Sequence, residues 1–226
     1  LEEDFHLPQL TPMQNEVRQR TRIAEVMGQG GWHVQLDCDE YFLDFQQFAR
    51  ELKRTIDSTP VTICCAWVTL YKKVDNGFLY IKPKKKEQVE YIQIATNNPV
   101  YEYGRRNRQF NIYTKHLLIH QSWARTEVEI TQKLANWGHR NDFDREHYLS
   151  AWRDVSADNY GQLIDFHPIT PTLWPRLIFL KAETIEEFND KFKWDDFPYT
   201  HLQLMLKNNV LLAKFRRLLS FFITRQ

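Results

Sequence analysis

The chain has 226 residues, of which 42% are hydrophobic and 26% are charged, and its formal net charge is +1 at pH 7. These values are typical of a soluble globular protein. The longest unbroken apolar runs are only a few residues long, so we expect no transmembrane segment. A chain of this length buries roughly 70% of the surface that its unfolded form exposes, and one domain over residues 1–226 is the simplest organisation.

Cysteine and glycine usage limits the chemistry that the sequence predicts. The three cysteines have no metal-ligand spacing, and the acidic first ten residues lack the apolar run of a signal peptide. The only glycine cluster, around Gly30, follows a predicted helix, whereas a phosphate-binding loop follows a strand. We therefore expect an intracellular protein, cytoplasmic or nuclear, without a metal or a cofactor.

Residues 1–60 are predicted to be mainly helical. Thr11 and Gln14 have the spacing of a capping box at the start of the first helix. A short strand is expected over residues 32–38. Apolar residues then recur with a helical period over residues 39–57, and Asp39 is the expected N-cap of this second helix.

Residues 61–121 are predicted to form an antiparallel β-meander. Residues 61–74 are apolar and β-branched on both faces, which is typical of a central strand covered on both sides. Asn76-Gly77 is a strong hairpin signal directly after it. The predicted strands cover residues 61–74, 78–82, 87–96, 100–103 and 109–121.

Residues 126–226 return to a mainly helical pattern. Thr126 and Thr184 each begin a capping box, Asp142 is a candidate N-cap, and one strand is expected over residues 176–182. Residues 201–224 form a long, largely apolar helix in this prediction. Together these elements predict an α+β fold, in which the meander packs against N-terminal and C-terminal helices.

The near-zero net charge conceals a segregation of charge along the chain. Residues 61–125 carry 11 basic and 4 acidic residues, whereas residues 1–60 carry 6 basic and 11 acidic ones. The positive charge of the predicted meander lies mainly in two connections, Lys82, Lys84, Lys85 and Lys86 in one and Arg105, Arg106 and Arg108 in the other. Because alternate connections of a meander lie at the same end of the sheet, we expect these clusters to share one edge.

Such an edge predicts a non-enzymatic nucleic-acid-binding protein, with single-stranded nucleic acid or RNA favoured. The seven basic side chains would hold phosphates without sequence preference. Tyr101 and Tyr103 would lie about 6.6 Å apart on one strand face, a spacing that suits stacking on successive bases. Phe110 and Lys115 extend the predicted site.

Several other interpretations fit the same residues. Basic turns are commonly solvated, and lysines protect sheet edges from pairing. The basic surface also suits an acidic protein partner, and the helix at residues 201–224 suits either a core or a protein-docking surface. A metal-dependent nuclease is a further alternative, using the carboxylates of residues 139–147 or those that accompany His33 on one strand face, Asp37 and Asp39.

Overall fold

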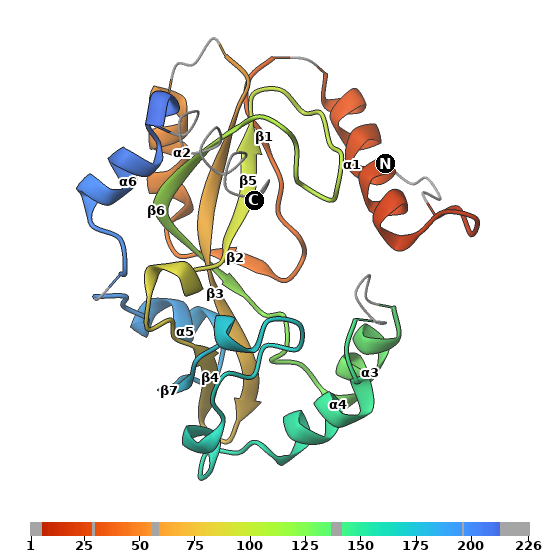
Figure 1. Cartoon of the computed structure of the whole chain (residues 1–226), viewed down its shortest axis with the longest axis vertical. Helices are drawn as coiled ribbons and strands as arrows, with labels where there is room; N and C mark the ends of the chain where they lie inside the picture. The colour runs from red at the N-terminus through yellow and green to blue at the C-terminus, as the bar shows by residue number, and fades with distance from the viewer. Residues whose placement is uncertain (1–5, 29, 56–58, 137–141, 196, 213–226) are drawn as a thin grey trace, which may run out of the picture.

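The computed structural model describes residues 6–28, 30–55, 59–136, 142–195 and 197–212, and it has an α+β fold. The long strand β3 (Val61–Val74) runs through the centre of the molecule and joins two parts of a curled mixed sheet (Figure 1). One part contains β1, β5, β6 and β2 around the first half of β3, and the other contains β4 and β7 beside its second half.

The first part of the sheet places β3 between β5 (Tyr91–Thr96) and β6 (Phe110–His120). β5 is antiparallel to β3, whereas β6 is parallel to it. The two-residue strand β1 (His33–Val34) extends the sheet beside β5, and β2 (Glu40–Phe42) extends it beside β6.

The second part of the sheet begins with the predicted hairpin. β4 (Gly77–Ile81) pairs antiparallel with the end of β3, and β7 (Leu177–Lys181) pairs antiparallel with β4. Asn76 has φ 61°, a left-handed conformation that asparagine tolerates better than most residues. The hairpin prediction is therefore confirmed, as is the strand expected near residues 176–182.

The helices cover both parts of the sheet (Figure 1). α2 packs against β3 and β6 through Phe48 and Leu52, and α5 packs Phe188 against β4. α3 and α4 close a third apolar cluster that contains Tyr71 of β3. The α-helices are α1 (Pro12–Met27), α2 (Phe45–Arg54), α3 (Glu127–Asn136), α4 (Arg145–Asp154), α5 (Ile185–Lys191) and α6 (His201–Lys207).

β3 carries the core of the molecule. Cys65 packs in the cluster under α2, Val68 and Leu70 pack in the cluster under α5, and Tyr71 belongs to the cluster under α3 and α4. Nearly every residue from Val61 to Tyr71 is buried, so the prediction of a central strand covered on both sides is confirmed.

The prediction of an antiparallel meander is correct only in part. After β5, the chain passes the end of β3 and forms β6 on the other side, parallel to β3. The connection of residues 97–109 is long enough to make this crossing. The strand predicted at residues 100–103 does not form. Within residues 97–109, all of which are described, the one strand-like pairing is the isolated bridge between Tyr103 and Arg106.

Two predicted helix caps are wrong by a few residues. Asp39 does not cap α2, because residues 40–42 pair with β6 and the helix begins only after Asp44, whose Oδ1 accepts from Gln47 N at 2.7 Å. α4 is likewise capped by Asp144 and not by Asp142. The capping boxes of Thr11 and Gln14 and of Thr126 and Glu129 are confirmed.

The C-terminal region is described as far as residue 212. α6 ends at Lys207, where Asn208 caps it, so the helix predicted from residue 201 is interrupted there. Residues 213–224 of that prediction lie outside the described residues, and their docking or core role stays a prediction. In the part of the chain that the structure covers, no helix has the length and apolar character needed to span a membrane.

Candidate functional site

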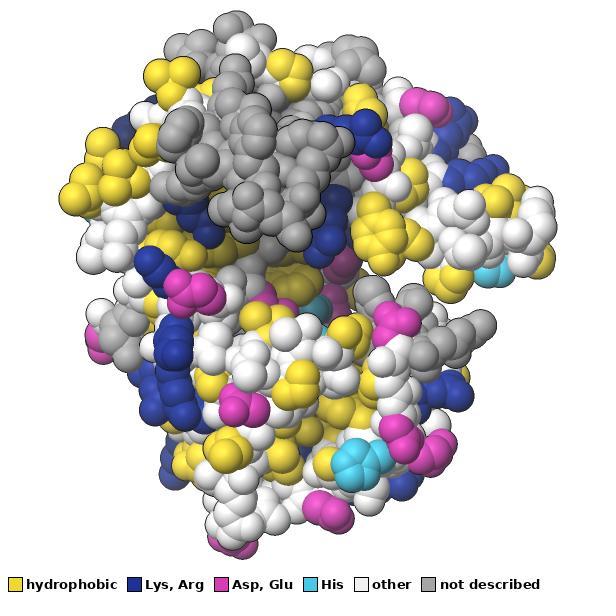
Figure 2. All heavy atoms as spheres, in the orientation of Figure 1, with side chains coloured by type: hydrophobic (Ala, Val, Ile, Leu, Met, Phe, Trp, Pro, Cys, Tyr) yellow, Lys and Arg dark blue, Asp and Glu magenta, His cyan; other side chains and the backbone are white. Residues whose placement is uncertain are grey.

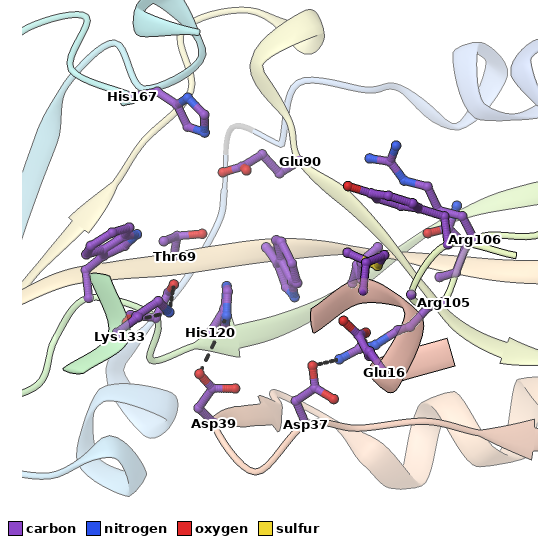
Figure 3. A pocket seen from close by; sticks show the side chains of 18 of the residues that line it. Glu16, Asp37, Asp39, Thr69, Glu90, Arg105, Arg106, His120, Lys133 and His167 are labelled. Carbon is purple, nitrogen blue, oxygen red and sulfur yellow. Dashed lines mark hydrogen bonds and ion pairs between the residues drawn. The ribbon is translucent and has the colours of Figure 1, made fainter. Parts of the chain in front are cut away.

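A cavity of about 370 Å³ lies where the two parts of the sheet meet along β3. Figure 2 shows a hollow in this face of the molecule, with acidic and histidine side chains visible inside it. The lining side chains come from positions spread between Met13 and Trp174, and Figure 3 labels those that carry charge. They include Glu16, Asp37, Asp39, Trp67, Thr69, Glu90, Tyr103, Arg105, Arg106, His120, Lys133, His167 and Trp174.

Strand geometry brings three of these residues together. Alternate residues of a strand share a face, so Trp67 and Thr69 of β3 both face the cavity. Thr69 is in register with His120, the last residue of β6, which places the imidazole beside the same face. The indole of Trp67 stacks on the His120 ring with centroids 4.1 Å apart.

A buried ion-pair network supports the floor of the cavity. Arg105 is 5% exposed, and its Nη2 lies 2.7 Å from Glu40 Oε2 and 2.6 Å from Asp37 Oδ2. The other Glu40 oxygen accepts from Trp67 Nε1 at 3.0 Å, so this network also holds the indole. Burial works against the charge of Arg105, but the carboxylates of Glu40 and Asp37 outweigh burial and raise its pKa.

His120 is a neutral imidazole at physiological pH. Burial lowers its pKa to about 3, although the carboxylate of Asp39 opposes this shift. Its Nε2 lies 3.8 Å from Asp39 Oδ2, which is too long for a hydrogen bond. Asp39 instead accepts from Arg125 Nη2 at 2.6 Å, so its charge is compensated by the guanidinium.

Two ionisable groups of the cavity have pKa values close to neutrality. Burial raises the pKa of Glu90 to about 7, while a 2.8 Å hydrogen bond from Trp174 Nε1 to Glu90 Oε2 partly offsets the rise. Burial lowers the pKa of Lys133 to about 8. Lys133 Nζ donates to the backbone oxygen of Ser122 at 3.0 Å and to its Oγ at 2.8 Å. These two hydrogen bonds use two of the three ammonium protons, so the third can be donated to a ligand.

Ion pairing decides which charges face the cavity without a counter-ion. Arg20 binds Glu16 and Asp37, and Arg125 binds Asp39, so these three carboxylates are compensated. Among the described residues, no carboxylate pairs with Arg106 or Lys133. The cavity therefore presents two cations and the Glu90 carboxyl to a ligand.

The two basic connections reach this region from opposite ends of β5. Residues 82–90 lead from β4 into β5, and residues 97–109 lead out of it, so the clusters do not share an edge in the predicted way. Glu90 at the end of the first connection lines the cavity, as do Arg105 and Arg106 of the second. The expectation of one edge fails because residues 100–103 form no strand, so the two clusters lie in consecutive connections at opposite ends of β5.

The predicted site residues have very different surroundings. Arg105 is buried in its ion pairs, and Tyr101 is 8% exposed in a smaller cavity beside α1 and β1. Arg108 is exposed and binds Glu102 at 2.9 Å. Tyr103 is 45% exposed, and the Arg106 guanidinium lies 5.9 Å from its ring centroid. Lys84, Lys85, Lys86 and Lys115 are exposed, Lys82 is half-buried, and Phe110 begins β6.

Sequence reasoning missed the residues that define the cavity. Glu90, Lys133 and Trp174 are far apart in the chain, and no spacing pattern connects them. Asp37 and Asp39 do line the cavity together, whereas His33, which was expected with them, faces the smaller cavities. His116, four residues before His120, binds Glu51 at 2.8 Å.

Within the described part of the acidic set at residues 139–147, that is residues 142–147, the structure shows no second candidate site. Asp144 is occupied as the N-cap of α4, accepting from His147 N at 3.0 Å. His139 lies outside the described residues. In the described ranges, no three His, Cys, Asp or Glu side chains are grouped so as to hold a metal ion.

Comparison with known proteins adds no relative to this picture. No family model, curated protein or solved structure matches the chain. The fold and site define an α+β protein with a curled mixed sheet and one large polar, aromatic-lined cavity at its centre. Function is therefore inferred from the side chains of that cavity.

Proposed function

We propose that the chain binds single-stranded nucleic acid, with RNA favoured, and that the central cavity holds the strand. One observation carries this proposal: Arg106 and Lys133, which pair with no carboxylate of the described residues, line the cavity together with Trp67, Tyr103, Trp123 and Trp174. Three of the four carboxylates of the lining, those of Glu16, Asp37 and Asp39, are already paired with arginines. A phosphate compensates such cations, and a nucleobase offers a flat face to each ring.

The rim of the cavity suits the entry of a base. Tyr103 is 45% exposed, and the turn that carries it also carries Arg106. A base stacked on an aromatic side chain contributes about 1–3 kcal/mol, with little sequence preference. Trp67 and Trp174 offer further ring surface deeper in the cavity.

In this proposal the exposed lysines act outside the cavity. Lys84, Lys85 and Lys86 lie on the connection that leads to Glu90, and Lys115 lies on β6. Together with Lys82 and Arg108 they would contact phosphates at the surface by releasing counter-ions. Arg105 has a structural role in this proposal and contacts no phosphate, because its guanidinium is bound by Glu40 and Asp37.

The test is the fluorescence anisotropy of a labelled single-stranded RNA titrated with the protein at several salt concentrations. Arg106→Glu is expected to weaken binding by about tenfold or more and to reduce the salt dependence by roughly one phosphate contact. Arg108→Glu is the matched control: it lies two residues away, is exposed, and is outside the lining of the cavity. Its effect is expected to be smaller.

Three results would contradict the proposal. An unchanged affinity of Arg106→Glu would remove the cavity from the binding site. An equal loss in Arg106→Glu and Arg108→Glu would indicate a diffuse surface attraction. If only the combined change of Lys84, Lys85 and Lys86 to glutamate abolished binding, the lysine connection would be the site.

A further inference from the structure

The cavity holds an acid and a base in positions that nucleic-acid binding alone does not require. Glu90 accepts one hydrogen bond from Trp174 Nε1, and no other described residue bonds its carboxyl group. Lys133 has one ammonium proton beyond those given to Ser122. Figure 3 shows Glu90 and Lys133 on different sides of the cavity, with Thr69 between them.

We propose that this cavity cleaves RNA, with Glu90 as the general base and Lys133 as the general acid. The inference rests on the proposed binding of RNA in the same cavity. Glu90 removes the proton from a ribose 2′-hydroxyl, and the 2′-oxygen forms a bond to the adjacent phosphorus. The bond from phosphorus to the 5′-oxygen breaks, and Lys133 gives that oxygen its proton.

The products are a 2′,3′-cyclic phosphate and a 5′-hydroxyl, so atoms and charges balance without water or any oxidant. The nucleophile belongs to the substrate, and the protein needs to supply only two proton transfers and charge compensation for the phosphate. Arg106 and Lys133 are the described cations of the cavity that have no carboxylate partner. They are therefore available to the phosphate oxygens.

The ionisation of the two groups suits these roles. Because the pKa of Glu90 is about 7 and that of Lys133 is about 8, both required forms coexist near pH 7.5. The groups that influence Lys133 are Asp39, Arg125 and Asp37, and His167 lies on the same side of the cavity as Glu90. General acid–base catalysis of this kind contributes about 10²–10⁴-fold to a rate.

The experiment uses the full chain, a fluorescent single-stranded RNA and excess EDTA, and identifies the cleaved ends by mass spectrometry. We expect cyclic phosphate ends and a rate that is maximal between pH 7 and 8. Glu90→Gln keeps an acceptor for Trp174 and is expected to lower the rate by about 100-fold or more, with little change in affinity. Lys133→Arg keeps the charge but not the acidity, and it is expected to act similarly.

Glu87→Gln is the matched control, because Glu87 is an exposed carboxylate on the same connection as Glu90. It should cleave at the unaltered rate. A loss of cleavage in Glu90→Gln but not in Glu87→Gln, with both purified in the same way, excludes a contaminating nuclease. RNA that is bound but stays intact overturns the catalytic inference alone, as does equal cleavage by Glu90→Gln. Cleavage of an all-deoxy strand at the same rate overturns the role of the 2′-hydroxyl. Absence of binding overturns the proposed function as well.

Discussion

The connections on either side of β5 carry similar positive charge but use it differently. In residues 82–90 the lysines at 84, 85 and 86 are exposed, and among the described residues their one ion pair is the 4.0 Å contact of Lys86 with Glu87. In residues 97–109, Arg105 is buried and bound at 2.6 and 2.7 Å by two carboxylates. Lys84, Lys85 and Lys86 of the first connection are therefore solvated, whereas Arg105 of the second is a structural element.

The difference shows why a count of charges does not identify a binding surface. A guanidinium is always charged and weakly hydrated, which suits a buried position between carboxylates, whereas an ammonium on a flexible stem is strongly hydrated. Within the arginine turn two identical side chains also differ in their surroundings: Arg105 is buried against Glu40 and Asp37, whereas Arg106 is exposed at the cavity rim. Availability to a ligand depends on which carboxylates the fold brings close.

The largest expected effect on stability follows from removing the buried guanidinium of Arg105. Arg105→Met leaves the Glu40 carboxylate, whose side chain is 0% exposed, without its guanidinium. Removing one partner of a buried ion pair destabilises a protein by about 3–5 kcal/mol. Urea denaturation followed by tryptophan fluorescence measures the change, because Trp67 is bonded to the same Glu40.

Lys84→Met is the corresponding change on the exposed connection. A substitution at such a surface position is expected to stay within about 0.5 kcal/mol of the unaltered protein. Equal losses from Arg105→Met and Lys84→Met would contradict the division between a structural and a solvated connection.

A smaller effect is expected from Glu90, where the lysine connection enters the cavity. Its pKa is raised from an ordinary value near 4.5 to about 7 in the folded protein, so between these pH values the folded state holds a proton that the unfolded state has lost. The free energy of unfolding therefore falls as pH rises through this window, by up to about 3 kcal/mol.

Glu90→Gln removes that ionisation and should flatten the dependence of stability on pH between 4.5 and 7. Denaturation midpoints at a series of pH values measure it, with Glu87→Gln as the control on the same connection. A slope that is unchanged in Glu90→Gln would show that other groups cause the pH dependence.

Local signals in the sequence predicted the elements, and long-range pairing determined the site. The capping boxes at Thr11 and Thr126, the Asn76 hairpin and the doubly covered strand β3 each depend on neighbouring residues, and each is confirmed. Thr184 does cap α5, but the Glu187 carboxylate accepts from Glu183 N, so that predicted capping box is incomplete. The parallel placement of β6 depends on a crossing past the end of β3, which residues 97–109 permit but do not encode in any periodicity.

The same limit applies to the cavity. The sequence predicts binding residues in the turn at residues 101–108, and this turn does line the cavity through Tyr103, Arg105 and Arg106. Its partners Glu90 and Lys133 were not recognised, because a lone glutamate before a strand and a lone lysine on a helix have ordinary surface roles. Their pKa shifts arise from burial, which only the assembled fold produces.

The smallest effect concerns the conformation that separates Arg105 from the exposed surface. Gly104 has φ 56°, and a Cβ atom there would lie 3.1 Å from Glu16 Oε1. Gly104→Ala is therefore expected to destabilise the protein by about 1–2 kcal/mol through the left-handed backbone and the close approach to α1. Gly161→Ala is the control, since Gly161 has no neighbour within 4 Å of an added Cβ and no positive φ. It should be neutral or slightly stabilising. If both changes were neutral in thermal denaturation, the turn would accommodate the alanine without strain. The buried position of Arg105 would then depend on its ion pairs with Glu40 and Asp37 and not on the conformation of Gly104.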